Sequence, residues 1–165
     1  MSTLAKLTDE EFLNLPDEPG KQELLDGELI ALPPAKDNHS RCAMSLLLLL
    51  IDAVGRERVR YEAGYRLKRG WLIPDVSVTW PNQPVDEWLL GAPMIPIEIA
   101  SRGNTAEEIE GKIAAYLEEG AAEVWILHPR TRTLRVVRKG HDLRVTGDYH
   151  CELIGVDIRL ADLLG

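Results

Sequence analysis

The sequence predicts an α/β (α+β) fold in which a mixed central β-sheet is flanked by α-helices, because two kinds of apolar spacing occur along the chain. Helical spacing covers residues 37–54 and 105–120. Strand-like stretches are interspersed with these helices, at residues 59–68, 73–80, 94–100, 123–127, 133–137 and 143–145. Such a mixture is typical of one sheet covered by helices. The length of 165 residues and the apolar content of 45% fit a single domain with a full core.

The N-terminal part of the chain predicts a short helix followed by a β-hairpin. Thr8 and Glu11 form a capping box, in which each residue satisfies the other's free backbone group at the start of a helix. Residues 22–30 then read as two strands joined by Asp26-Gly27. This dipeptide tolerates the positive φ angles that a tight two-residue turn requires.

The next helix has clear start and stop signals. Asp37 or Asn38 is its expected cap, and Gly55 follows its last turn. Five consecutive leucines at residues 46–50 make this helix apolar nearly all round. We therefore expect it to be buried on more than one side.

The charge of the chain is unusual for a DNA-binding protein but does not exclude a nuclease. The formal net charge is −8, whereas duplex binding relies on Lys and Arg side chains that neutralise phosphates. An acidic metal site adds negative charge by design, and two arginine-rich segments, residues 56–69 and 130–144, offer local positive charge. The simpler interpretation is that these segments are strands with solvated, charged outer faces.

The cysteines and the apolar runs indicate in which cellular compartment the protein is expected. Cys42 and Cys151 are too far apart in the chain to form a metal or redox motif. The N-terminus lacks a basic-then-apolar signal pattern, and the longest apolar run, residues 43–51, is too short to span a bilayer. We expect a soluble, cytoplasmic protein with no membrane partner.

Two acidic residues interrupt apolar strands and mark the candidate site. Asp75 lies among Ile73, Val76 and Val78, and Glu98 lies in the run of residues 95–100. Burying a carboxylate costs several kcal/mol of folding free energy unless its charge is compensated. Acidic residues inside otherwise apolar strands therefore tend to occur at functional sites. Two carboxylates that face one point are stabilised by a hard cation such as Mg²⁺, which polarises a phosphoryl oxygen and activates water.

A lysine on the following helix completes the candidate triad. A second capping box, Thr105 to Glu108, opens this helix, and Lys112 borders its apolar face next to Tyr116. A helix that folds back over the sheet would bring this edge towards Glu98, where an ammonium could orient water or offset phosphate charge. An ordinary surface lysine whose stem covers apolar area is an equal alternative on spacing alone. A structural ion pair between Lys112 and these acids would give the same sequence pattern.

At these residues the chain resembles a known family, the Uma-type restriction endonucleases, long labelled a domain of unknown function, within the PD-(D/E)XK nuclease superfamily. The resemblance runs from about residue 23 to about residue 137. The segments that carry it, in chain order, are Glu23-Leu-Leu-Asp-Gly-Glu-Leu29, Asn38-His39, Pro74-Asp-Val-Ser-Val78, Pro96-Ile-Glu-Ile-Ala-Ser101, Lys112-Ile-Ala-Ala-Tyr116 and Gly120-Ala-Ala-Glu-Val-Trp-Ile-Leu-His-Pro129.

The resemblance implies a single PD-(D/E)XK nuclease-like domain over residues 1–165, with a restriction-endonuclease-like mixed central β-sheet flanked by α-helices and an N-terminal helix and β-hairpin. It makes Asp75 and Glu98 catalytic residues and ligands of Mg²⁺ or Mn²⁺, and Lys112 the catalytic lysine. The superfamily usually places its lysine two residues after the glutamate, which is Ala100 here, so the helix must supply it. Glu23 is the candidate for a further metal ligand.

Three functions follow from these residues. The leading hypothesis is a metal-dependent endonuclease that hydrolyses DNA phosphodiester bonds, as a homodimer because two-fold symmetry suits cutting two strands. The second is a catalytically inactive binding or scaffold module with a nuclease fold, which the acidic pI favours. The third is a metal hydrolase of small phosphate esters. His39, at the start of a helix, fits a substrate role or a purely local one.

Overall fold

The computed structural model describes residues 5–165, which form four α-helices, one 3-10 turn and three β-sheets. The helical elements are α1 (Asp9–Leu13), α2 (Asp37–Val54), the 3-10 turn η1 (Arg56–Arg58), α3 (Ala106–Glu118) and α4 (Leu160–Leu164). The strands are β1 (Lys21–Leu25), β2 (Glu28–Leu32), β3 (Val59–Tyr61), β4 (Tyr65–Leu67), β5 (Gly70–Leu72), β6 (Val76–Val78), β7 (Leu89–Leu90), β8 (Ile95–Ile99), β9 (Val124–His128), β10 (Thr133–Arg138), β11 (His141–Val145), β12 (Asp148–Cys151) and β13 (Val156–Arg159).

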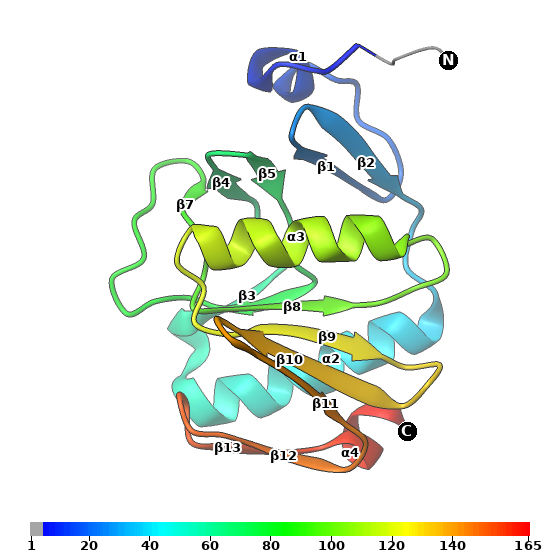
Figure 1. The fold of residues 1–165 in the computed structure, drawn as a ribbon, viewed down its shortest axis with the longest axis vertical. Coiled ribbons are helices and arrows are strands. Elements are labelled where there is room, and N and C mark those ends of the chain that lie inside the picture. The colour runs from blue at the N-terminus through cyan, green and yellow to red at the C-terminus, as the bar shows by residue number, and fades with distance from the viewer. Residues whose placement is uncertain (1–4) are drawn as a thin grey trace.

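The central sheet confirms the predicted fold class. Its six strands lie in the order β11-β10-β9-β8-β6-β3, and it is mixed, because β8 and β9 run parallel while its other neighbours are antiparallel. Helix α3 covers one face of this sheet, and α2 lies behind the other (Figure 1). Alternate residues of each strand therefore enter two separate cores, one under α2 and α4 and one under α3.

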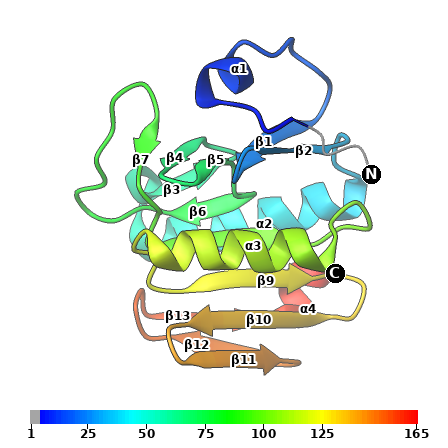
Figure 2. The same ribbon diagram turned by 45° about the horizontal axis from the view of Figure 1, so that its top comes forward.

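A second, five-stranded sheet lies beside α3 and closes the second core (Figure 2). Its order is β2-β1-β5-β4-β7, so the N-terminal hairpin forms one of its edges. The remaining strands, β12 and β13, form a two-stranded sheet next to α4. No helix within residues 5–165 has both the length and the apolar character needed to cross a bilayer.

Two predicted strands differ in the structure. The stretch 59–68 was expected to be continuous, but it divides between β3 in the central sheet and β4 in the second sheet. Glu62 has a φ of 46° at the break, and this left-handed conformation turns the chain from one sheet to the other. The predicted strand 73–80 is shortened to β6. Pro74, which has no N–H group for a ladder, precedes this strand, and after it the backbone N–H of Trp80 donates to the Gln83 side chain.

The local signals near the helix ends are largely confirmed. Both capping boxes form, at Thr8 and at Thr105. Asp26 and Gly27 adopt φ angles of 53° and 82° in the turn between β1 and β2, as the tight hairpin requires. The cap of α2 was predicted wrongly, since its first flanking residue is Lys36 and no side chain caps the helix.

Helix α2 is buried on one side only, which contradicts the expectation drawn from its leucines. Cys42, Ala43, Leu46 and Leu50 face the central sheet. The opposite side is exposed over three large apolar residues, Met44, Leu48 and Ile51.

Candidate active site

The strand register places the two predicted acids opposite each other. Strands β6 and β8 are antiparallel, with Val76 paired to Ile97. Continuing this register by one residue sets Asp75 opposite Glu98, at a spacing where cross-strand side chains are typically about 5 Å apart. The backbone N–H of Ile99 donates to Oδ2 of Asp75 at 2.6 Å, which fixes the aspartate against β8.

The period of the strands decides which way the acids point. Ile97 and Ile99 enter the core under α2, so Glu98 between them faces the α3 side of the sheet. The same alternation turns Asp75 away from Val76, which lies in the core under α2. Asp75 and Glu98 are 3% and 7% exposed, so both carboxylates need compensation from neighbouring groups.

Helix α3 supplies two groups to Glu98. The Nζ atom of Lys112 lies 3.6 Å from Oε2 of Glu98, and the hydroxyl of Tyr116 donates to Oε1 at 2.9 Å. Lys112 and Tyr116 are four residues apart and therefore share one side of the helix. Lys112 is only 1% exposed, which excludes the alternative of an ordinary surface lysine.

Strand β1 brings a second carboxylate to Lys112. Oε2 of Glu23 lies 2.5 Å from the Lys112 ammonium, as a close, buried ion pair. Oε1 of Glu23 accepts a hydrogen bond from the backbone N–H of Ile73 at 2.7 Å. Both oxygens of Glu23 are thus engaged, and the residue is fully buried.

Lys21 was not predicted and belongs to the same cluster. Its ammonium donates to Oδ1 of Asp75 at 2.9 Å and to the carbonyl of Ile73 at 2.8 Å. Lys21 precedes Glu23 by two residues on β1, so a strand period of two puts both on one face. That spacing was the available signal, but only the tertiary structure shows that this face meets Asp75.

His39 also reaches the cluster from the first turn of α2. Its Nε2 atom lies 3.4 Å from Oδ1 of Asp75. The hydrogen bond to Asp75 raises the pKa of His39 above its ordinary value, although partial burial acts in the opposite direction. The structure therefore gives His39 a place beside the candidate centre rather than only a local role at the helix start.

The two central carboxylates are held in different electrostatic environments. Burial raises the pKa of Glu98 to about 7, against the lowering effect of the Lys112 and Lys21 charges. Burial also acts to raise the pKa of Asp75, but the His39 hydrogen bond and the Lys21 charge outweigh it and lower this pKa to about 2. The neighbouring carboxylates raise the pKa of Lys112 although its burial opposes this, so its amine is held as a cation.

The structure thus brings Asp75, Glu98, Lys112 and Glu23 together, from two strands of the central sheet, α3 and the N-terminal hairpin. Within residues 5–165, no three His, Cys, Asp or Glu side chains are grouped as a ready metal cage. Mg²⁺ is commonly bound by only one or two carboxylates, with waters completing its octahedral shell. Asp75 and Glu98 match that smaller donor set.

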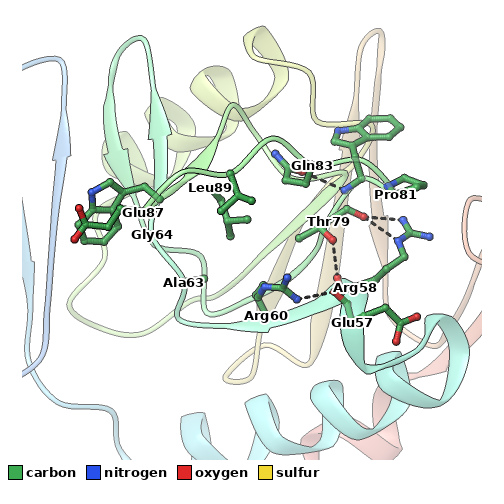
Figure 3. Close-up of a pocket in the computed structure, with 13 residues that line it drawn as sticks. Glu57, Arg58, Arg60, Ala63, Gly64, Thr79, Pro81, Gln83, Glu87 and Leu89 are labelled. Atoms are coloured by element: carbon green, nitrogen blue, oxygen red, sulfur yellow. Dashed lines mark hydrogen bonds between the residues drawn. The ribbon is translucent and has the colours of Figure 1, made fainter.

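An open pocket of about 500 Å³ is lined by residues around β3 and by the loop between β6 and β7, and none of its lining residues belongs to the carboxylate cluster (Figure 3). Arg58 and Arg60 line it, but both guanidinium groups already donate to backbone carbonyls, of Thr79 and Glu57 respectively. Its walls include two partly exposed tryptophans, Trp80 and Trp88. This pocket is separate from the carboxylate cluster.

The arginine-rich segments are partly neutralised within the protein. Arg69 forms ion pairs with Asp26 and Glu118, and Arg135 forms ion pairs with Glu110 and Asp142. These pairs support the interpretation of charged outer faces for part of each segment. They leave other arginines of the segments, such as Arg56 and Arg130, exposed at the surface.

Comparisons with known proteins agree with the observed fold. A crystal structure described as "a putative nuclease belonging to DUF820", from Anabaena variabilis, has the same fold, with a TM-score of 0.85 and 22% sequence identity over 96% of this chain and 97% of that one. No curated protein matches the chain. The family Uma2, described as "Putative restriction endonuclease", matches residues 9–151. The chain therefore belongs to the Uma2 family.

Proposed function

We propose that this protein is a metal-dependent endonuclease that hydrolyses DNA phosphodiester bonds. The observation that carries this proposal is the register of β6 and β8, which sets Asp75 opposite Glu98. The Lys112 ammonium lies 3.6 Å from the Glu98 carboxylate. Membership of the Uma2 family supports a nuclease function.

The donor set of the cluster fits Mg²⁺ or Mn²⁺. Oδ1 of Asp75 and Oε2 of Glu98 are hard oxygen donors, and neither accepts a hydrogen bond from the backbone. We propose that these two residues hold the ion, in part by exchanging the Lys21 contact for a metal contact. When bound, such an ion polarises a phosphoryl oxygen and lowers the pKa of a water molecule near it.

The remaining residues orient the reacting groups. The cationic Lys112 lies beside Glu98, where its ammonium orients the attacking water and offsets the charge that develops on the phosphate. Tyr116 fixes the Glu98 carboxylate through its hydroxyl. Burial of the cluster strengthens each of these interactions, because the local dielectric is low.

Glu23 has a positioning role in this proposal. Sequence resemblance suggested it as a metal ligand, but its oxygens contact the Ile73 N–H and the Lys112 ammonium. We propose that Glu23 holds Lys112 in place and contacts the ion only through water. A buried carboxylate so close to an ammonium sets both the charge and the direction of the lysine side chain.

The substrate and assembly follow from the same proposal. A DNA strand would be contacted by exposed arginines of segments 56–69 and 130–144, since the net charge of −8 disfavours binding elsewhere. A homodimer would present one centre to each strand. The cytoplasmic location expected from the sequence stays a prediction.

A plasmid assay tests the proposal. Supercoiled plasmid is incubated with the protein in Mg²⁺, in Mn²⁺ and in EDTA. We expect nicked or linear product only with metal, and at least a 100-fold slower reaction for Asp75→Ala. Asp157→Ala, which removes an exposed acid paired with His150 outside both arginine-rich segments, is the control and should cleave at the wild-type rate. Cleavage that survives Asp75→Ala would refute the assignment.

One observation favours the second candidate, a nuclease-fold binding module without activity. Lys21 pairs with Asp75, and Lys112 pairs with Glu23 and Glu98, so these carboxylates already belong to an internal ion-pair network. Such a network needs no metal for stability. This alternative predicts that divalent ions leave the melting temperature unchanged, whereas binding to the folded state raises it by mass action.

A further inference from the structure

Helix α2 exposes an apolar stripe that nothing within residues 5–165 covers. Met44, Leu48 and Ile51 are 57%, 64% and 37% exposed, and they recur at the i, i+4, i+7 spacing of one helix face. The opposite face packs on the central sheet, on the side away from α3 (Figure 1). Large apolar side chains grouped in this way are typical of an interaction surface rather than of scattered exposure.

Charged residues flank the stripe at both ends of the helix. At about 100° per residue, Asp37, Arg41 and Asp52 all lie within about 60° of Leu48 on the helical wheel. All three are exposed, as is Arg56 just after the helix. None of the four has an ion-pair partner in the described part of the chain. An apolar centre with a charged rim is the usual anatomy of a protein interface.

The order of these charges is self-complementary. A two-fold axis midway between Leu46 and Leu47 would set Arg41 of one copy level with Asp52 of a second copy. The same axis would set Asp37 level with Arg56. A single rotation therefore satisfies two different opposite-charge pairs, and each pair occurs twice because a two-fold interface repeats every contact.

We propose that α2 pairs with α2 of a second copy of this chain in antiparallel orientation, around an axis between Leu46 and Leu47. Met44, Leu48 and Ile51 of both copies form the apolar centre, and Arg41 and Asp52 form the inner ion pairs. Antiparallel helices also set opposite ends of their dipoles side by side. A different partner would need its own matching charges, whereas this helix carries both halves of the match.

This interface explains the leucine run that the single chain leaves half exposed. It also gives the homodimer of the proposed function a defined surface, although it does not depend on nuclease activity. His39 lies on the same helix, 3.4 Å from Asp75, so each copy's candidate centre stands at a fixed place relative to the axis.

Sedimentation velocity of the full chain over a concentration series tests the proposal without metal or DNA. We expect a species of about twice the 18.5 kDa chain mass. Leu48→Glu should raise the dimer dissociation constant at least about tenfold, because two like charges then meet in the apolar centre. Leu143→Glu is the matched control, since Leu143 is 49% exposed on the edge strand β11, the other obvious route to self-association.

Charge reversal tests the antiparallel register itself. Arg41→Asp and Asp52→Arg should each weaken the dimer several-fold, and the double variant should return it towards the wild-type constant. Melting curves followed by circular dichroism confirm that every variant is folded. A monomer at all concentrations, a dimer that Leu48→Glu leaves intact, a dimer lost in Leu143→Glu, or a double variant no better than the single ones would each overturn the proposal.

Discussion

The ammonium of Lys21 lies 2.9 Å from Oδ1 of Asp75, where it occupies the side of the carboxylate that the proposed metal ion would use. A lysine and a divalent cation cannot both bind this atom closely. Lys21 therefore neutralises Asp75 in the metal-free protein, and the two cations should compete for it.

Lys21→Met should destabilise the metal-free protein by about 3 kcal/mol, because Asp75 would remain buried without its partner. Saturating Mn²⁺ should regain much of this loss, since the ion then supplies the missing charge. Urea unfolding of both proteins with Mn²⁺ and with EDTA measures the effect. Lys36→Met, at an exposed position before α2, is the control. An equal loss with and without Mn²⁺ would contradict the competition.

Lys112→Met should cost about 3–5 kcal/mol of unfolding free energy, because Glu23 and Glu98 would lose their shared buried cation. Glu23→Gln in the same chain removes one of these charges, so the double variant should be less destabilised than the sum of the two single variants. Chemical denaturation of all four proteins completes the double-mutant cycle. Strict additivity would show that Glu23 and Lys112 are not coupled.

Tyr116→Phe should slow plasmid cleavage about tenfold, because the Glu98 carboxylate loses the hydrogen bond that fixes it. It should also lower stability by about 2 kcal/mol. Tyr149→Phe is a matched control, since its hydroxyl donates to Glu123, a buried carboxylate outside the candidate centre. A similar loss of cleavage in both variants would point to stability rather than to Glu98.

The raised pKa of Glu98 predicts how stability depends on pH. Its ordinary value is 4.5 and its value in the folded chain is about 7, so between these limits the folded state binds a proton that the unfolded state has released. The unfolding free energy of the metal-free protein should therefore fall as pH rises from about 4.5 to about 7, by about 3 kcal/mol. Asp75, with a pKa of about 2, stays ionised throughout this window.

Glu98→Gln should remove most of that slope, because the amide does not titrate. Denaturation in urea at several pH values, in the presence of EDTA, measures it. His39, whose pKa is also raised, contributes a smaller slope of the same sign in both proteins. Equal slopes for the wild type and Glu98→Gln would show that Glu98 does not titrate in this range.

Much of the candidate centre could be predicted because its residues follow local periodicities. A strand period of two and the antiparallel neighbours β6 and β8 suffice to place Asp75 beside Glu98. The helical wheel of α3 suffices to set Lys112 and Tyr116 on one side. The resemblance to a nuclease family then suggested that Asp75, Glu98 and Lys112 belong to one site.

Other features depend on contacts that no local pattern encodes. Lys21 meets Asp75 across 54 residues, because the N-terminal hairpin joins a second sheet that sequence periodicity did not reveal. The break between β3 and β4 depends on the left-handed backbone of Glu62, a residue type that rarely adopts it. The burial of α2 was overestimated because an apolar helix face can pack either within its own chain or against another molecule, and the sequence pattern is the same in both cases.

The melting temperature in the presence of Mn²⁺ tests the central claim most directly, since it reports on the ion without assuming a substrate. If Asp75 and Glu98 hold a divalent cation, millimolar Mn²⁺ should raise the melting temperature of the wild type by several degrees and leave that of Asp75→Asn unchanged. An identical response of the two proteins, or no response in the wild type, would contradict the metal centre.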